Sequence, residues 1–100
     1  MTPEGVIKKQ IMDWLRAQPR AYGWLIQVGK IPGRTNHSKG IADIIGVFRG
    51  RGLAIEVKAP KGKLTPEQAT FLDMWTACGG ISIVARSLED VLSVLTEREI

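Results

Sequence analysis

Near the start of the chain, apolar residues recur at the spacing of an amphipathic helix. The apolar stripe occupies positions i, i+4, i+7 and i+8 and consists of Ile7, Ile11, Trp14 and Leu15. Thr2 and Pro3 suit an N-cap and a first helical position, and Pro19 ends the pattern. The spacing therefore predicts a helix that begins near Pro3 and ends before Pro19.

Two further helices are predicted in the second half of the chain. Residues 65–77 begin with Thr65 as N-cap, and Gln68 stands three residues later, which is the arrangement of a capping box. The inward face of this helix would carry Phe71, Leu72 and Trp75, and a Gly-Gly pair at 79–80 would end it. Ser87 is the expected N-cap of a last helix with apolar residues at 91, 92 and 95.

Four stretches rich in β-branched residues predict strands, at residues 23–30, 41–48, 53–58 and 81–85. Arg49-Gly50-Arg51-Gly52 has the composition of a hairpin turn, and residues 31–40 that of a loop. The order is then helix, three strands, helix, strand, helix. It predicts an α/β fold in which residues 1–100 form one domain, with a four-stranded mixed sheet flanked by helices.

Composition narrows the class of protein. The chain is 44% hydrophobic and 24% charged, and no apolar run approaches the roughly 20 residues that span a bilayer. One cysteine, Cys78, and one histidine, His37, exclude an intrachain disulfide and a zinc site of four Cys and His ligands. A reducing cytoplasm is therefore expected. We also expect Cys78 and the three tryptophans, Trp14, Trp24 and Trp75, to lie in the core.

The positive charge is concentrated in one part of the sequence. Eight cations lie between positions 30 and 63: Lys30, Arg34, Lys39, Arg49, Arg51, Lys58, Lys61 and Lys63. Asp43 and Glu56 are the only acids there, so this window carries +6 and the remainder −2. A basic segment around an acidic pair suits a polyanion bound close to metal ions, and we take its cations as candidate DNA-binding residues. A solvated surface is the alternative interpretation.

Asp43 and Glu56 each lie within a short apolar run, and Lys58 follows two residues after Glu56. A carboxylate among β-formers is unusual, because a buried charge must be paired or bound to a metal. Two acids that converge from neighbouring strands with a lysine indicate a divalent-metal site and phosphodiester hydrolysis. The alternative is a structural salt bridge with Arg49 or Lys58.

These motifs resemble the PD-(D/E)xK nuclease superfamily, and within it the stand-alone VRR-NUC (virus-type replication-repair nuclease) domains. The resemblance rests on Glu4, on the segments at 39–43, 55–58 and 64–68, and on the element order. Ala42 stands where the superfamily name implies proline, a difference of backbone shape and not of ligation. The resemblance implies a restriction-endonuclease-like αβββαβ(α) core.

The resemblance also implies roles for individual residues. Asp43, Glu56 and the carbonyl of Val57 would hold Mg²⁺ or Mn²⁺, and Lys58 would orient the attacking water. Glu4 would hold a second metal or its water, although an acid also suits the positive end of a helix. Gln68 would position the lysine or the water, unless it serves only as the partner of its cap. We expect His37 to be a loop residue in contact with solvent or DNA.

The sequence thus predicts a metal-dependent DNA endonuclease. The family implies a phage or prophage protein that acts on branched or junction DNA, as a Holliday-junction resolvase does. A homodimer would place two active sites on two strands. The alternatives are a catalytically silent nucleic-acid-binding module of the same fold, and an RNA-directed nuclease.

Overall fold

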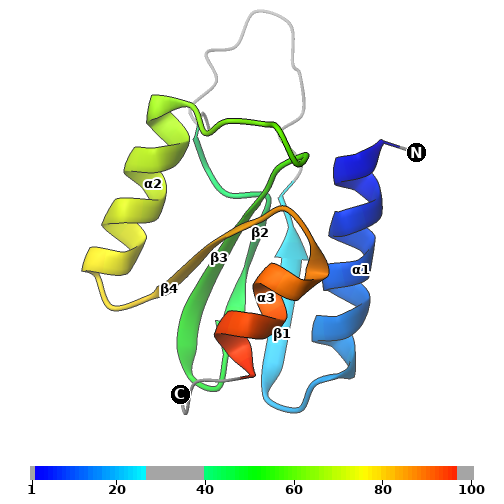
Figure 1. The fold of residues 1–100 in the computed structure, drawn as a ribbon. Helices are drawn as coiled ribbons and strands as arrows, with labels where there is room; N and C mark the ends of the chain where they lie inside the picture. Colours follow the sequence, from blue (N-terminus) through cyan, green and yellow to red (C-terminus); the bar gives the residue numbers. More distant parts are fainter. Residues whose placement is uncertain (1, 27–39, 97–100) are drawn as a thin grey trace, which may run out of the picture.

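The computed structural model describes residues 2–26 and 40–96. The predicted order of elements is confirmed (Figure 1). In chain order the elements are α1 (Pro3–Ala17), β1 (Ala21–Leu25), β2 (Ile44–Phe48), β3 (Arg51–Val57), α2 (Pro66–Ala77), β4 (Ile81–Ala85) and α3 (Leu88–Leu95). The predicted caps are present on all three helices, since the side chains of Thr2, Thr65 and Ser87 each accept a backbone hydrogen bond.

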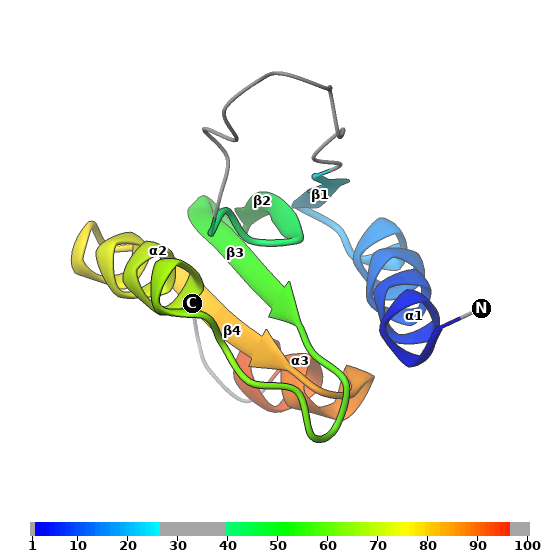
Figure 2. The same ribbon diagram turned by 90° about the horizontal axis from the view of Figure 1, so that it is seen from above.

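The four strands form one mixed sheet in the order β1-β2-β3-β4. The first three are antiparallel neighbours, whereas β4 runs parallel to β3 and is reached through the crossover helix α2. Seen from above, α1 and α3 cover one face of the sheet and α2 lies on the other (Figure 2). This is the predicted α/β fold with a mixed sheet flanked by helices.

The larger core lies between the sheet and the pair α1 and α3. Its largest fully buried side chains come from these two helices and from strands β2 and β3: Ile11, Leu15, Ile44, Phe48, Leu53, Ile55, Val57, Val91 and Leu95. A smaller cluster under α2 is built around Ala42, Ala54 and Leu72. Because α2 lies over β3 and β4, Tyr22 and Trp24 of β1 and Val47 of β2 stay exposed on the same face, whereas Ile45 of β2 still packs against the smaller cluster.

The exposed face corrects two expectations about the core. Trp24 is 51% exposed, together with Tyr22 at 60% and Val47 at 43%, because no described helix covers this half of the sheet. Trp14 and Trp75 do pack against the two clusters, as predicted. Cys78 is also exposed, because it is the C-cap of α2 and lies outside both cores.

Several strand boundaries differ from the prediction. The turn between β2 and β3 is only Arg49-Gly50, both with positive φ (50° and 86°), so β3 begins at Arg51 and not at Leu53. This is the backbone pattern of a two-residue type I′ hairpin, which matches the twist of the flanking strands. β1 begins two residues early because Ala21 pairs with Phe48. β2 begins at Ile44, so Asp43 directly precedes it.

Part of the predicted basic window cannot be placed. Lys30, Arg34, His37 and Lys39 lie outside the described residues. Within residues 2–26 and 40–96, no helix is long and apolar enough to cross a membrane.

Candidate active site

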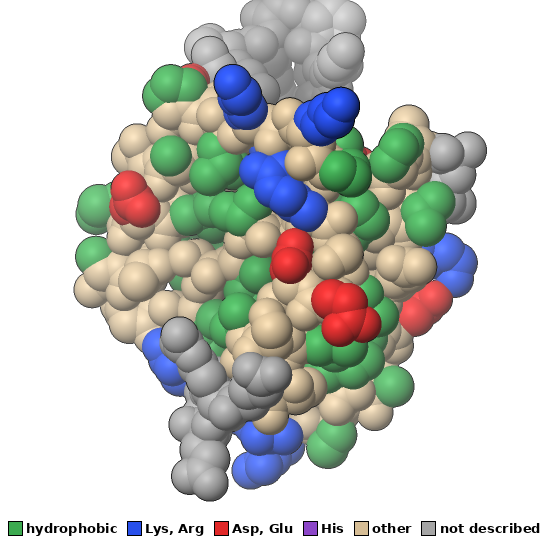
Figure 3. Space-filling view, in the orientation of Figure 1, with side chains coloured by type: hydrophobic (Ala, Val, Ile, Leu, Met, Phe, Trp, Pro, Cys, Tyr) green, Lys and Arg blue, Asp and Glu red, His purple; other side chains and the backbone are tan. Residues whose placement is uncertain are grey.

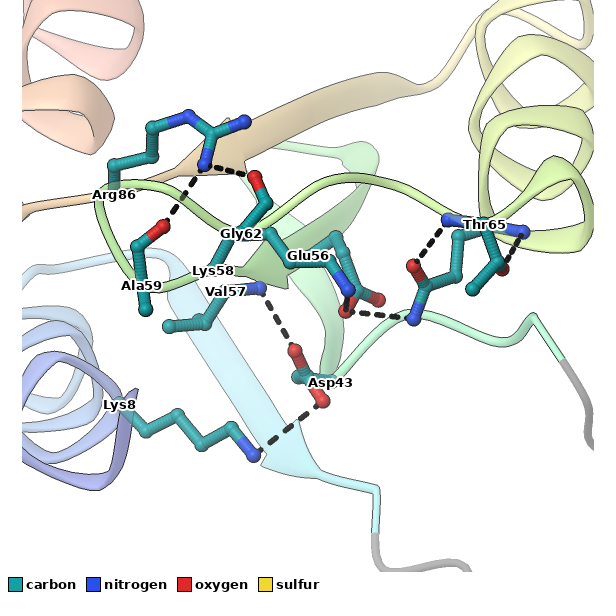
Figure 4. Close-up of polar contacts among 10 residues, drawn as sticks. Lys8, Asp43, Glu56, Val57, Lys58, Ala59, Gly62, Thr65 and Arg86 are labelled. Carbon is teal, nitrogen blue, oxygen red and sulfur yellow. Dashed lines mark hydrogen bonds and ion pairs between the residues drawn. The ribbon is translucent and has the colours of Figure 1, made fainter. Parts of the chain in front are cut away.

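The two predicted acids meet at one end of the β2–β3 hairpin. Ile44 pairs with Ile55, which places Asp43 beside Glu56 on the neighbouring strand. The Oδ2 atom of Asp43 accepts a hydrogen bond from the backbone N–H of Val57 at 2.8 Å (Figure 4), and the Asp43 carboxyl group is close enough to Glu56 to raise the pKa of Glu56. Backbone pairing between the strands therefore forces two carboxyl groups together.

Glu56 is the one buried charged residue of the described chain, with 3% of its surface exposed. Its Oε2 accepts a hydrogen bond from Nε2 of Gln68 at 3.3 Å, whereas its buried Oε1 has no hydrogen-bond partner. Burial raises the pKa of Glu56 to about 8, and the nearby Asp43 adds to this rise. A buried carboxyl group with one unpaired oxygen is costly for the fold, which is typical of a functional site.

Lys58 lies directly after β3 and points to the same acid. Its backbone N–H donates to the carbonyl of Ala85 at 2.9 Å, which extends the sheet by one residue beyond Val57. The Nζ atom lies 3.9 Å from Oε2 of Glu56, and only 13% of the side chain is exposed. Lys58 is therefore held at the acidic pair and is not a solvated lysine at the end of a strand.

Gln68 is the partner of its cap and also contacts the buried acid, whereas its role in positioning the lysine or the water stays a prediction. Its side-chain Oε1 accepts a hydrogen bond from the backbone N–H of Thr65 at 2.9 Å. Its backbone N–H donates to Thr65 Oγ1, which completes the capping box. The remaining amide N–H group reaches Glu56. The cap thus fixes the side chain that contacts the buried acid.

A residue that the sequence did not single out, Lys8 of α1, contacts the site from the opposite side. Its Nζ lies 3.4 Å from Oδ1 of Asp43 (Figure 4). Asp43 therefore pairs with Lys8, whereas, among the described residues, the salt bridge that the alternative interpretation expected is present only between Glu56 and Lys58. Glu4 lies one helical turn earlier, and this i, i+4 spacing was the available signal. In the described ranges Glu4 forms no metal-binding group with Asp43 and Glu56, so its role stays a prediction.

Two further contacts hold the connecting segments in place. Arg86 donates from Nη1 to the carbonyls of Ala59 and Gly62, at 2.9 and 2.6 Å, and so fixes the loop that follows Lys58. Gly40 has a φ of +90°, and a Cβ there would lie closer than 3.0 Å to the backbone of Glu67. The segment before Asp43 can approach the start of α2 this closely only with glycine.

The described cations of the basic window separate into two groups. Lys58, Lys61 and Lys63 lie in or next to the loop at the site, whereas Arg49 and Arg51 lie at the opposite end of the hairpin. Arg51 donates to the carbonyl of Gly79 at 3.0 Å. In the view of Figure 1, cationic side chains gather at the upper end of the molecule, where β3 leads into α2, and others lie at the lower end (Figure 3).

The donor set fits a hard divalent cation. Such ions prefer carboxylate and carbonyl oxygens and retain several waters, so few protein ligands suffice. Asp43 and Glu56 supply the carboxylates, and the unpartnered Oε1 of Glu56 is an oxygen that a cation would satisfy. Over residues 2–26 and 40–96, no third acid, histidine or cysteine joins them, so further ligands would be the Val57 carbonyl and water.

The family model of the VRR-NUC domain matches residues 27–89. The chain belongs to the VRR-NUC family. The matched range includes Asp43, Glu56, Lys58 and Gln68, whereas Glu4 and Lys8 precede it. The protein is therefore a nuclease-fold domain.

Solved structures support the same fold. One described as a VRR_NUC domain is 21% identical, covers 99% of this chain and 100% of its own, and superimposes with a TM-score of 0.74. A second, described as a VRR_NUC domain protein, is 22% identical, covers 97% of this chain and 88% of its own, and has a TM-score of 0.71. No curated protein sequence matches the chain.

Proposed function

We propose that this protein is a Mg²⁺- or Mn²⁺-dependent DNA endonuclease that hydrolyses phosphodiester bonds. The observation that carries the proposal is the buried Glu56, which lies next to Asp43, has one oxygen (Oε1) without a hydrogen-bond partner, and has its other oxygen approached by Lys58. A structural acid would have both oxygens satisfied, because an unpaired buried oxygen only destabilises the fold. A cation and a substrate phosphate account for what the protein alone leaves unsatisfied.

Each residue has a defined part in this reaction. Asp43, Glu56 and the Val57 carbonyl would hold the divalent cation, which neutralises phosphate charge and polarises water. The ammonium group of Lys58 would donate hydrogen bonds to the attacking water and to the phosphoryl oxygens, on which negative charge develops. Gln68 keeps Glu56 Oε2 oriented, and its own position is fixed by the capping box. Glu4 is retained as a candidate for a second cation or for water.

The substrate is proposed to be DNA, with branched or junction DNA as the preferred class. Support comes from the family and from the exposed Lys61 and Lys63, which flank the site and can contact phosphates without reading bases. The cations at Lys30, Arg34 and Lys39 belong to the same proposal on the strength of the sequence. A phage or prophage protein in the cytoplasm of a bacterial host fits the resemblance.

A homodimer is proposed because one strand edge of the sheet is suited to pairing. Among the strands that the structure describes, β1 has no neighbour on its outer side, and its sequence Ala-Tyr-Gly-Trp-Leu carries neither charge nor proline. Exposed edge strands are normally protected by such residues. Tyr22, Trp24 and Leu25 are 60%, 51% and 41% exposed, and the ring centroids of Tyr22 and Trp24 lie 4.5 Å apart. Pairing of β1 with its copy around a two-fold axis would bury these side chains.

The dimer is tested by light scattering after size-exclusion chromatography. Trp24→Glu should yield a monomer, and Met74→Glu should not, although Met74 on α2 is 60% exposed and Trp24 51%. A wild-type protein that stays monomeric at high concentration would refute the dimer.

The activity is tested with supercoiled, four-way-junction and matched RNA substrates in Mg²⁺, Mn²⁺ or EDTA. We expect metal-dependent cleavage of DNA that EDTA abolishes. DNA binding without cleavage in either metal would instead support the alternative, a catalytically silent nucleic-acid-binding module. Preferred cleavage of RNA would replace DNA as the proposed substrate.

A further inference from the structure

Lys8 contacts the site through a specific oxygen of Asp43. The Oδ2 atom of Asp43 is bound to the backbone N–H of Val57, so its direction is fixed by the sheet. The other oxygen, Oδ1, is the atom that lies 3.4 Å from Nζ of Lys8. Oδ1 is therefore the oxygen that a divalent cation would use, and in this structure a lysine ammonium group lies against it.

The surroundings of this contact distinguish Lys8 from an ordinary surface lysine. Its side chain is 32% exposed and that of Asp43 is 23% exposed, so the pair is half-buried. The neighbouring Lys9 is 66% exposed and pairs instead with Asp13 on the outer side of α1. Adjacent lysines of one helix thus make one ion pair inside the site and one outside it.

We propose that Lys8 is a positioning residue that occupies the place of the divalent cation at Asp43 and gives it up when the cation binds. This proposal rests on the proposed metal-dependent function. Without metal, two carboxyl groups lie side by side and repel each other once ionised, and Lys8 offsets that repulsion. With metal, the ammonium group and the cation compete for the same oxygen. Lys8 therefore stabilises the metal-free protein and weakens metal binding.

A binding measurement on the whole protein tests this without reference to activity. Mn²⁺ alone is titrated calorimetrically into the wild type, Lys8→Met, Lys8→Arg and Lys9→Met, and melting temperatures are recorded in EDTA and in Mn²⁺. A unit charge and a double charge roughly 6 Å apart in water repel by an energy worth about tenfold in a binding constant. We therefore expect Lys8→Met to bind Mn²⁺ about tenfold more tightly and to melt at a lower temperature in EDTA.

The two other variants serve as controls. Lys9→Met removes the same charge one residue away and should bind Mn²⁺ as the wild type does, whereas Lys8→Arg keeps the charge and should restore wild-type affinity. The proposal is overturned if Lys8→Met binds Mn²⁺ no more tightly than Lys9→Met, or if Lys8→Arg tightens binding as much as Lys8→Met. Absence of Mn²⁺ binding by the wild type would overturn the metal-dependent function itself, which is a separate outcome.

Discussion

Each end of the β2–β3 hairpin carries a pair of charged residues, but the two pairs differ in how far their charges are exposed and satisfied. At the turn end, Arg49 and Arg51 are exposed, and Arg51 is satisfied by the carbonyl of Gly79. At the other end, Asp43 and Glu56 are forced together, and one buried oxygen is left without a partner. The first end closes the sheet at little cost, whereas the second keeps an arrangement that destabilises the metal-free fold. That difference is why we propose the second end as the place of the chemistry.

The largest expected effect comes from removing the acids that define the site end. We expect Asp43→Asn and Glu56→Gln each to reduce cleavage roughly a thousandfold or more, because the cation can no longer be held at the phosphate. Stability in EDTA should be unchanged or higher, since the repulsion between the two carboxyl groups is removed. Cleavage rates and melting temperatures are measured together.

Arg51→Gln at the turn end is the control for this pair. It removes a charge and the hydrogen bonds to Gly79, so it should lower stability slightly and leave the cleavage rate of folded protein unchanged. Near-full activity of Asp43→Asn or Glu56→Gln, with contamination excluded, would refute a metal site at these two acids.

Lys58 separates catalysis from binding at the same end. Lys58→Ala should lower the single-turnover cleavage rate by about a hundredfold or more, because its ammonium group acts on charge that develops in the transition state. Affinity for DNA should stay within a few-fold, since ground-state binding comes from the surrounding cations. Parallel cleavage and mobility-shift assays decide this. Equal losses in both would mean that Lys58 is only a phosphate contact.

The stability of the metal-free protein should depend on pH through Glu56 at the site end and not through the arginines at the turn end. The pKa of Glu56 is raised to about 8, so between its ordinary value of 4.5 and 8 the folded protein keeps a proton that the unfolded chain releases. The metal-free protein should therefore lose stability as pH rises through this range. We expect a fall in melting temperature of roughly 5 °C or more in EDTA, since about 1 kcal/mol shifts a domain of this size by that much.

Glu56→Gln cannot release this proton, so its melting temperature should vary much less over the same range, whereas Arg51→Gln should follow the wild type. The same fall in Glu56→Gln as in the wild type would show that the pKa of another group causes it.

Local signals in the sequence predicted most of the fold. The Thr65-Pro66 start with Gln68 predicts α2 and its capping box, because a cap involves only residues within one turn of the chain. The sequence predicted the position of the turn at Arg49-Gly50 but not its length. Because the turn has only two residues, β3 begins at Arg51. β1 begins at Ala21, earlier than predicted, because Ala21 pairs with Phe48 of β2. The local sequence of β1 carries no signal of this pairing.

The parts that could not be predicted depend on packing between distant segments. Lys8 and Asp43 are 35 positions apart, and their contact depends on how α1 rotates on the sheet. The amide of Gln68 reaches Glu56 only because α2 docks closely, and Gly40 permits that approach. Trp24 has an apolar side chain at a strand position, and only the full arrangement shows that no described helix covers it. The contacts around the acidic pair and the exposure of individual side chains therefore could not be predicted without the structure.

The smallest expected effect concerns the cations. Lys61→Gln with Lys63→Gln neutralises two exposed residues at the site end, and Arg49→Gln with Arg51→Gln makes the same change at the turn end. We expect only the first pair to weaken DNA binding, by several-fold, and to reduce the slope of log affinity against log salt by about one per lost phosphate contact. If both pairs act equally, the DNA-binding surface extends along the whole sheet or only net charge matters.

The most direct test of the account asks whether the acidic pair binds a divalent cation at all. Mn²⁺ is titrated calorimetrically into the wild type, Glu56→Gln and Arg51→Gln at neutral pH and in the absence of DNA. The account predicts saturable binding to the wild type and to Arg51→Gln, and its loss in Glu56→Gln. Equal binding by all three proteins, or none by the wild type, would contradict a metal site at Asp43 and Glu56.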